Sequence, residues 1–205
     1  MLVFLLQGLV LGATAAMQPG PLQAFLLSQT LKNGWRRTLP AAFAPLISDG
    51  PIVLLVLFIL TQTPVWFLQI LQIIGGLFLL YLAYGAFYAY KTAVSLNPTP
   101  SDTGQQNLFK AALMNFLSPN PYIFWATIAG PIFINGWREA PIDGISFVLG
   151  FYVAIIGGFM AFIGLFALTS KLDPRISRLL SLISAIALLL FGLYQLSKGL
   201  SFLWT

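Results

Sequence analysis

The tetrapeptide Gln18-Pro19-Gly20-Pro21 interrupts the first long apolar segment of the chain, and Ser118-Pro119-Asn120-Pro121 interrupts another about half a chain length later. Proline disrupts a helix interior because it lacks an N–H group and its ring collides with the carbonyl group four residues earlier. In a lipid bilayer the carbonyl groups that lose their donors need another partner. Paired interruptions at matching places in two halves of a chain indicate the binding site of a transporter.

Composition places the chain among membrane proteins. Charged residues make up 7% of the 205 residues, against about 25% in a soluble domain, and the mean hydropathy is +0.90. The sequence has neither cysteine nor histidine, which excludes disulfides, thiolate metal sites and histidine-based catalysis. We therefore expect no cofactor, no metal and no enzymatic activity. The net charge of +5 reflects membrane topology rather than nucleic-acid binding.

Six apolar stretches are each long enough to cross the hydrocarbon core, which needs about 20 residues. They are Leu2–Gln29, Pro40–Leu60, Val65–Tyr90, Leu108–Ile134, Ile142–Thr169 and Ile176–Leu203. The second and third meet at Thr61–Pro64, a predicted hairpin. We expect an all-α membrane protein of one domain, residues 1–205. Repeat 1 covers about 1–90, a cytoplasmic surface linker covers 91–107, and repeat 2 covers about 108–205.

Basic residues predict the orientation of these spans. Eight of the ten fall in three connections expected on one face, namely Lys32, Arg36, Arg37, Lys91, Lys110, Lys171, Arg175 and Arg178. The positive-inside rule puts this face in the cytoplasm and both termini outside it.

Three spans in each half have a geometric consequence, because the two halves then cross the bilayer in opposite directions. The interrupted segments, in spans one and four, approach the middle of the bilayer from opposite faces, as in inverted-repeat transporters. The sequence Asn-Gly-Trp-Arg follows each interruption, at residues 33–36 and 135–138, and supports an internal repeat. Coincidence is the alternative, since proline and glycine are frequent in membrane helices.

The interrupted segments supply candidate binding groups. Proline frees the carbonyl groups of Ala15, Met17, Asn115 and Leu117. The N–H groups of a restarted helix suit an anion such as a carboxylate. The predicted substrate-binding residues are Gln18, Pro19, Gly20, Pro21, Asn115, Ser118, Pro119, Asn120, Pro121 and Tyr122. A plain kink between packed helices is the alternative interpretation.

Asp49 is the only acidic residue well inside a predicted span. An ionised side chain at the bilayer centre costs about 2.5–3.5 kcal/mol on insertion scales, so such a residue is a functional hypothesis by default. We expect Asp49 to carry a proton or to pair with a cationic substrate. The tetrapeptide Ser48-Asp49-Gly50-Pro51 is also typical of a turn or helix cap, and the two interpretations are compatible.

Gly8, Gly12 and Ala16 recur every four residues in the first span, and similar small-residue patterns occur in the fifth. This spacing lets helices approach closely, so we expect packing within the chain, with a homodimer as the alternative.

Four elements together carry a family resemblance: Pro19-Gly20-Pro21, Asp49, the run Gly75–Gly85, and the heptapeptide at residues 115–121, Asn-Phe-Leu-Ser-Pro-Asn-Pro. With them the chain resembles the LysE/RhtB family of amino-acid exporters, over the whole six-span layout. The resemblance implies a small exporter of amino acids or their derivatives in the bacterial inner membrane, driven by proton exchange. The family motif usually reads Asn-Pro-Lys, whereas Tyr122 follows Pro121 here and supplies no fixed positive charge.

We therefore expect a secondary transporter that exports a small polar metabolite, above all an amino acid, by proton-coupled alternating access. The alternative is a protein of the same superfamily that translocates or organises lipids or glycolipids, with an apolar groove open to lipid. An intramembrane enzyme is disfavoured, because the chain has no histidine or cysteine and only one deep acid for a metal site or a catalytic dyad. A serine–lysine pair would need Lys91, Lys110 or Lys198, and all three lie near span ends. Cadmium export is disfavoured because soft metals prefer thiolate ligands.

Overall fold

A computed structural model describes residues 1–56, 65–92, 102–172 and 174–201, and every secondary-structure element in these ranges is helical. The all-α prediction is therefore confirmed for the described residues. The elements are α1 (Leu2–Met17), α2 (Pro21–Asn33), α3 (Trp35–Thr38), η1 (Leu39–Phe43), α4 (Ala44–Leu54), α5 (Val65–Thr92), α6 (Gly104–Phe116), α7 (Pro119–Phe124), η3 (Trp125–Ala129), α8 (Gly130–Glu139), α9 (Pro141–Leu172) and α10 (Pro174–Gly199).

Three helices of the described ranges, α5, α9 and α10, are long and apolar enough to cross a membrane. Helices α1 and α2 together form a fourth such segment, bent by 64° at its break. The remaining predicted spans consist of shorter pieces. The span predicted at Pro40–Leu60 contains η1 and α4, and the one at Leu108–Ile134 is divided among α6, α7, η3 and α8. Six spans in two inverted repeats stay a prediction, and the Thr61–Pro64 hairpin lies outside the described residues.

Both proline motifs break a helix as predicted. Helix α1 ends at Met17, Gln18 and Gly20 are extended, and α2 begins at Pro21. Helix α6 ends at Phe116, and after an extended Ser118 the chain becomes helical again at Pro119. Proline is tolerated at the first position of a helix, because its missing N–H would have no partner there. Each proline motif therefore ends one helix and begins the next.

The two Asn-Gly-Trp-Arg copies adopt different structures. In the first, Gly34 has φ +81°, in the left-handed region that favours glycine, and it separates α2 from α3. The second copy lies inside α8, where a Cβ on Gly136 would meet the ring of Phe4 at 3.1 Å. The shared tetrapeptide therefore does not mark equivalent turns in the two halves.

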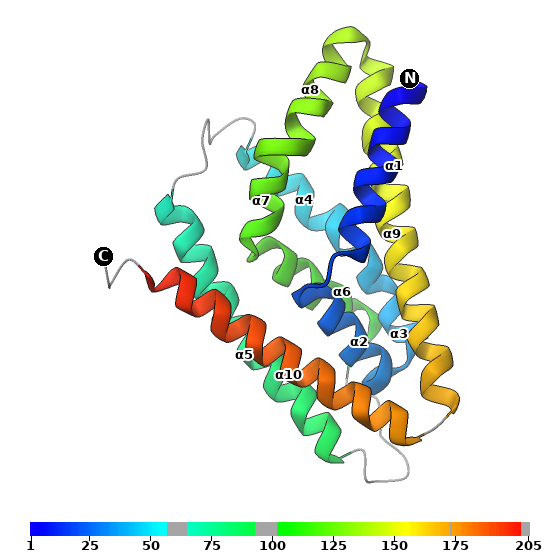
Figure 1. Cartoon of the computed structure of the whole chain (residues 1–205), viewed down its shortest axis with the longest axis vertical. Helices are drawn as coiled ribbons and strands as arrows, with labels where there is room; N and C mark the ends of the chain where they lie inside the picture. The colour runs from blue at the N-terminus through cyan, green and yellow to red at the C-terminus, as the bar shows by residue number, and fades with distance from the viewer. Residues whose placement is uncertain (57–64, 93–101, 173, 202–205) are drawn as a thin grey trace.

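Two long helix pairs frame the molecule (Figure 1). Helix α1 lies along α9, and α5 lies along α10, while the short helices fill the space between the pairs. A Cβ on Gly8 or Gly12 would collide with the backbone of α9, so the small residues of α1 allow close packing within the chain. The predicted small-residue stripe is thus occupied by a helix of the same chain.

The linker expected at 91–107 is shorter than predicted. Helix α5 continues to Thr92, and α6 already begins at Gly104 with a capping box between Thr103 and Gln106. Asp102 is 8% exposed and Asn107 is fully buried, so these two side chains pack on the helices, whereas Thr103, Gln105 and Gln106 are exposed. Hydrogen-bonding partners explain this difference, because Asp102 binds side chains of α2 and α6. Residues 93–101 lie outside the described part of the chain.

Candidate functional site

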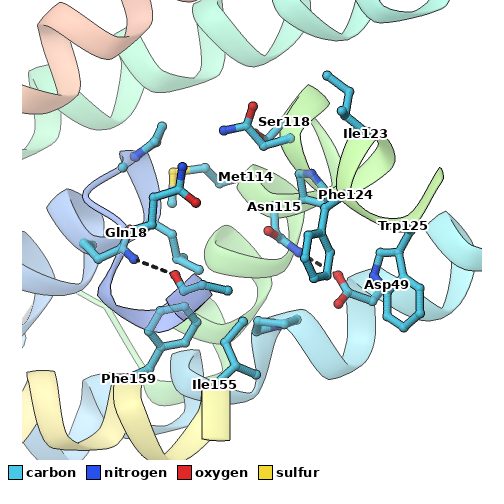
Figure 2. A pocket seen from close by; sticks show the side chains of 18 of the residues that line it. Gln18, Asp49, Met114, Asn115, Ser118, Ile123, Phe124, Trp125, Ile155 and Phe159 are labelled. Atoms are coloured by element: carbon cyan, nitrogen blue, oxygen red, sulfur yellow. Dashed lines mark hydrogen bonds between the residues drawn. The ribbon is translucent and has the colours of Figure 1, made fainter. Parts of the chain in front are cut away.

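The two breaks open into one cavity of about 330 Å³. Figure 2 shows Gln18 from the first break and Asn115 and Ser118 from the second around this space, with Asp49 of α4 at its edge. Nine of the predicted site residues line the cavity: Gln18, Pro19, Gly20, Pro21, Asp49, Asn115, Ser118, Asn120 and Pro121. Segments about one hundred positions apart in the sequence therefore meet at a single site.

Asp49 lies on the buried face of α4. Pro45, Ser48, Asp49 and Ile52 are buried at helical spacing, whereas Leu46 and Ile47 are about half exposed. The outward face is apolar, as expected next to lipid, while the inward face carries the polar pair Ser48 and Asp49 between apolar residues. The carboxyl group of Asp49 is only 3% exposed and is directed toward the cavity.

Neutral donors surround the Asp49 carboxylate. Asn115 Nδ2 donates to Oδ1 at 3.0 Å and to Ser48 Oγ at 2.7 Å, and the Tyr152 hydroxyl donates to Oδ2 at 3.3 Å. The indole of Trp125 lies beside the carboxylate in Figure 2, and its N–H is a further neutral donor next to Asp49. None of the ion pairs within the described ranges involves Asp49. The carboxylate is therefore positioned by hydrogen bonds and is not neutralised by a fixed cation there.

Donors from the protein reach three of the four carbonyl groups that lose a helical partner to proline, two of them from side chains and one from the backbone. Gln23 Nε2 donates to the Ala15 oxygen at 3.5 Å and to the Ala16 oxygen at 3.2 Å. Gln195 Nε2 donates to the Leu117 oxygen at 3.2 Å, and the Ser118 N–H reaches the Asn115 oxygen at 3.2 Å. At these positions the protein itself supplies one donor to the carbonyl oxygen, and binding of a solute by these groups stays a prediction.

The start of α2 remains as a polar feature of the first break. Its N-cap, Gly20, has no side chain to bind the first N–H groups, and the first intrahelical bond runs from Ala24 N to Gly20 O. The N–H groups of Leu22 and Gln23 precede that bond, and both residues line the cavity. Such a helix start carries partial positive charge and suits an anion.

Two predicted site residues do not line the cavity, namely Pro119 and Tyr122. Tyr122 is fully buried, with its ring packed edge-on against Phe67 and Phe116 at centroid distances of 5.3 and 6.1 Å. Its hydroxyl donates to the carbonyl oxygen of Phe116 at 3.0 Å. The Tyr122 hydroxyl therefore caps the C-terminal end of α6, and the side chain stabilises the second break without lining the cavity.

Sequence reasoning missed the wall that α9 contributes. Phe151, Ile155 and Phe159 line the cavity, and Tyr152 reaches Asp49 from the same helix. Their four-residue spacing is visible in the sequence. In a helix that is apolar on all sides, however, this spacing does not distinguish a cavity-lining face from a lipid-facing one.

A second buried acid lies outside the cavity, in a group we call the Asp102 cluster (Asp102, Lys32, Asn33 and Lys110). Lys110 Nζ lies 2.7 Å from Oδ1, and Lys32 Nζ lies 3.2 Å from Oδ2. Asn33 Nδ2 donates to Oδ2 at 3.3 Å. Burial favours the neutral acid, but the hydrogen bond from Lys110 and the charges of Lys32 and Lys110 outweigh it and hold the pKa of Asp102 below its ordinary value. The cluster ties the end of α2 to α6.

Comparison with known proteins assigns the chain to a family. The family model described as LysE type translocator matches residues 13–199. The arginine exporter protein ArgO of Klebsiella pneumoniae (strain 342) is 29% identical over 213 residues, which cover 97% of this chain and 95% of the relative. ArgO of Escherichia coli (strain K12) is 29% identical over 184 residues, covering 86% of this chain and 82% of the relative. No solved structure matches the chain. Since the family model spans most of the sequence, the protein belongs to the LysE type translocators.

Proposed function

We propose that the protein exports a small amino acid across the bacterial inner membrane in exchange for protons. The observation that carries this proposal is the shared cavity, where two helix breaks and one carboxyl group surround the same space. A free amino acid presents one ammonium group and one carboxylate, and the cavity offers an acid and a helix start to match them. The names of the relatives, arginine exporters, support an amino acid as the class of substrate.

The substrate carboxylate binds at the start of α2 in this proposal. The N–H groups of Leu22 and Gln23 have no earlier carbonyl partner in the helix, and the extended Gly20 leaves room above them. Polar side chains of the second break, Ser118 and Asn120, lie on the same cavity and complete the polar end.

Asp49 couples the substrate to the proton. Its ionised carboxylate binds the substrate ammonium group on the cytoplasmic side, and a proton arriving from outside neutralises the carboxylate and releases the ammonium. The proton then leaves to the cytoplasm and restores the negative charge. One carboxyl group does not hold both cations at once, so each amino acid exported is exchanged for a proton. The absence of a fixed cation beside Asp49 in the described structure favours this role.

Alternating access requires the two halves to move relative to each other, and the packing supports an inverted arrangement. Helix α1 packs on α9, while α6 packs on η1 and α4. The first piece of each broken segment thus contacts the second predicted span of the other half, as an inverted repeat predicts. Basic residues favour a cytoplasmic position for one end of the molecule, where Lys32 and Lys110 meet Asp102. Both termini then lie outside the cytoplasm.

The lipid-translocation alternative has less support. It predicts an apolar groove as the working site, and an apolar hollow of about 440 Å³ does lie beside Val3, Leu6, Val10 and Ile132. Neither helix break nor Asp49 lines that hollow, whereas all three line the polar cavity. We therefore keep amino-acid export as the proposed function.

Purified protein in proteoliposomes tests the proposal. With the vesicle interior made acidic, we expect labelled amino acids to accumulate inside as protons leave, and dissipation of the pH gradient to abolish this accumulation. Protein-free vesicles and vesicles with Asp49→Asn are the controls. Gradient-driven movement of a fluorescent lipid, without transport of any proteinogenic amino acid, would contradict the proposal and favour the alternative.

A further inference from the structure

One face of α9 gives the cavity an apolar wall. Phe151, Ile155 and Phe159 recur every four residues, line the cavity and are 2%, 6% and 2% exposed. Figure 2 shows Ile155 and Phe159 on one side of the cavity and Ser118 on the other. The site therefore has a polar end, made by the helix breaks and Asp49, and an apolar side, made by α9.

From this division we infer that the substrate is a neutral amino acid with an apolar side chain, of the size of leucine or phenylalanine. The inference rests on the proposed function and narrows it. The amino and carboxylate groups occupy the polar end, and the side chain packs against the apolar stripe of α9, where its burial is favourable.

The charges of the cavity match a neutral amino acid better than arginine. Among the described residues that line it, Asp49 is the sole charged group, and the partial positive charges come from two helix starts, that of α2 at Pro21 and that of α7 at Pro119. A neutral amino acid carries one positive and one negative group, and both are matched. Arginine carries a second positive group, for which the described lining offers no second acid, and an unpaired charge is costly to bury.

The neutral acceptors of the lining carry no charge to balance a guanidinium group, and several of them already accept a hydrogen bond from the protein. The carbonyl groups of Ala15, Ala16 and Leu117, which the helix breaks would otherwise expose, already accept hydrogen bonds from Gln23 and Gln195. An aromatic face also attracts a cation, tryptophan most strongly, but the lining tryptophan, Trp125, lies beside Asp49 and not on the apolar stripe of α9. The rings of Phe124 and Phe151 moreover stack on each other, with centroids 5.5 Å apart.

Transport by proteoliposomes under a pH gradient tests this inference, with labelled leucine, phenylalanine and arginine compared at equal concentration. We expect the initial rates for leucine and phenylalanine to exceed the rate for arginine by about tenfold or more, which corresponds to one carboxylate–cation contact missing for arginine. The same panel is run on Ile155→Glu, which adds an acid to the apolar stripe, and on Ile155→Gln, which has the same length without the charge.

Each outcome decides a different claim. If the ratio of the arginine rate to the leucine rate rises in Ile155→Glu and not in Ile155→Gln, the result supports the inference that the substrate side chain packs against α9. If the unaltered protein transports arginine as well as or better than leucine, the inferred substrate class is overturned while amino-acid export stands. If folded protein transports none of the three and no other amino acid competes, the proposed function fails as well. Should both Ile155 variants fail to fold, the comparison of the three substrates in the unaltered protein still decides the inference.

Discussion

Two buried aspartates of this protein have opposite surroundings. Asp102 is bound by Lys32 and Asn33 at the end of α2 and by Lys110 of α6. Asp49 is bound by the neutral side chains of Asn115 and Tyr152. A carboxylate with fixed cations stays ionised and acts as a structural tie. A carboxylate held by neutral donors is able to exchange one mobile cation for another. The same residue type is therefore a structural tie at one place and, in the proposed mechanism, the proton carrier at the other.

Replacement of Asp49 should have the largest effect. In Asp49→Asn we expect the proton-driven transport rate to fall by about 100-fold, because loss of a charge partner at a buried site costs about 3 kcal/mol and every 1.4 kcal/mol is a factor of ten. Initial rates in proteoliposomes with and without a pH gradient measure this. Folding is checked by size-exclusion profile and thermal unfolding. Gradient-driven transport at the original rate would remove Asp49 from the mechanism.

Replacement of Asp102 should change stability and leave coupling intact. In Asp102→Asn we expect the free energy of unfolding to fall by about 1–3 kcal/mol, because hydrogen bonds to charged groups are lost and two lysines lose their partner. Thermal unfolding in detergent measures the loss, with Lys110→Met as a matched variant that removes one partner from the other side. The comparison between the two acids breaks down if Asp102→Asn instead keeps its melting temperature and loses the response to the pH gradient.

Tyr152 tests the contacts of Asp49 at finer scale. Its hydroxyl makes one long hydrogen bond to the carboxylate, at 3.3 Å. Tyr152→Phe keeps the ring and removes that bond, so we expect the transport rate to fall by about threefold to tenfold, in line with roughly 0.5–1.5 kcal/mol for a single hydrogen bond. Tyr194→Phe, on an exposed tyrosine of α10, is the control. An equal loss in both variants would show that the effect does not pass through Asp49.

The pH dependence of stability should separate the Asp102 cluster from the cavity. The folded-state pKa of Asp102 lies below its ordinary value, so its contribution is fully present above the ordinary aspartate pKa and is lost only as the pH falls through the lowered value. The difference in melting temperature between the unaltered protein and Asp102→Asn should therefore stay constant from about pH 8 to pH 5. A difference that shrinks steadily across this window would contradict the assignment.

Features that depend on local chemistry were predictable from the sequence. Proline determines both helix breaks without reference to the rest of the fold, and a lone acid in an apolar segment identified Asp49 as a functional candidate. The structure also brings these features to one cavity. The family assignment is confirmed by the match over residues 13–199.

Features that depend on distant partners were not predictable. Gln195 donates a hydrogen bond to the carbonyl oxygen of Leu117, 78 positions away, and Asp102 accepts one from Lys32, 70 positions away. Tyr122 was expected in the site because of its place in the motif, but it turns toward Phe67 instead. In a membrane protein both lipid-facing and buried residues are apolar, so hydrophobic periodicity does not tell which face of α9 meets the cavity.

The close fit of α1 on α9 limits how the molecule moves. At Gly8 and Gly12 an added Cβ would collide with the backbone of α9, so the two helices pack backbone to backbone across the two predicted halves. Relative motion of the halves, as proposed for alternating access, has to keep this contact or break it. If α1 stays on α9, a swing of α2 has its pivot between Met17 and Pro21, directly at the cavity, so the proposed opening of the path would also move the start of α2.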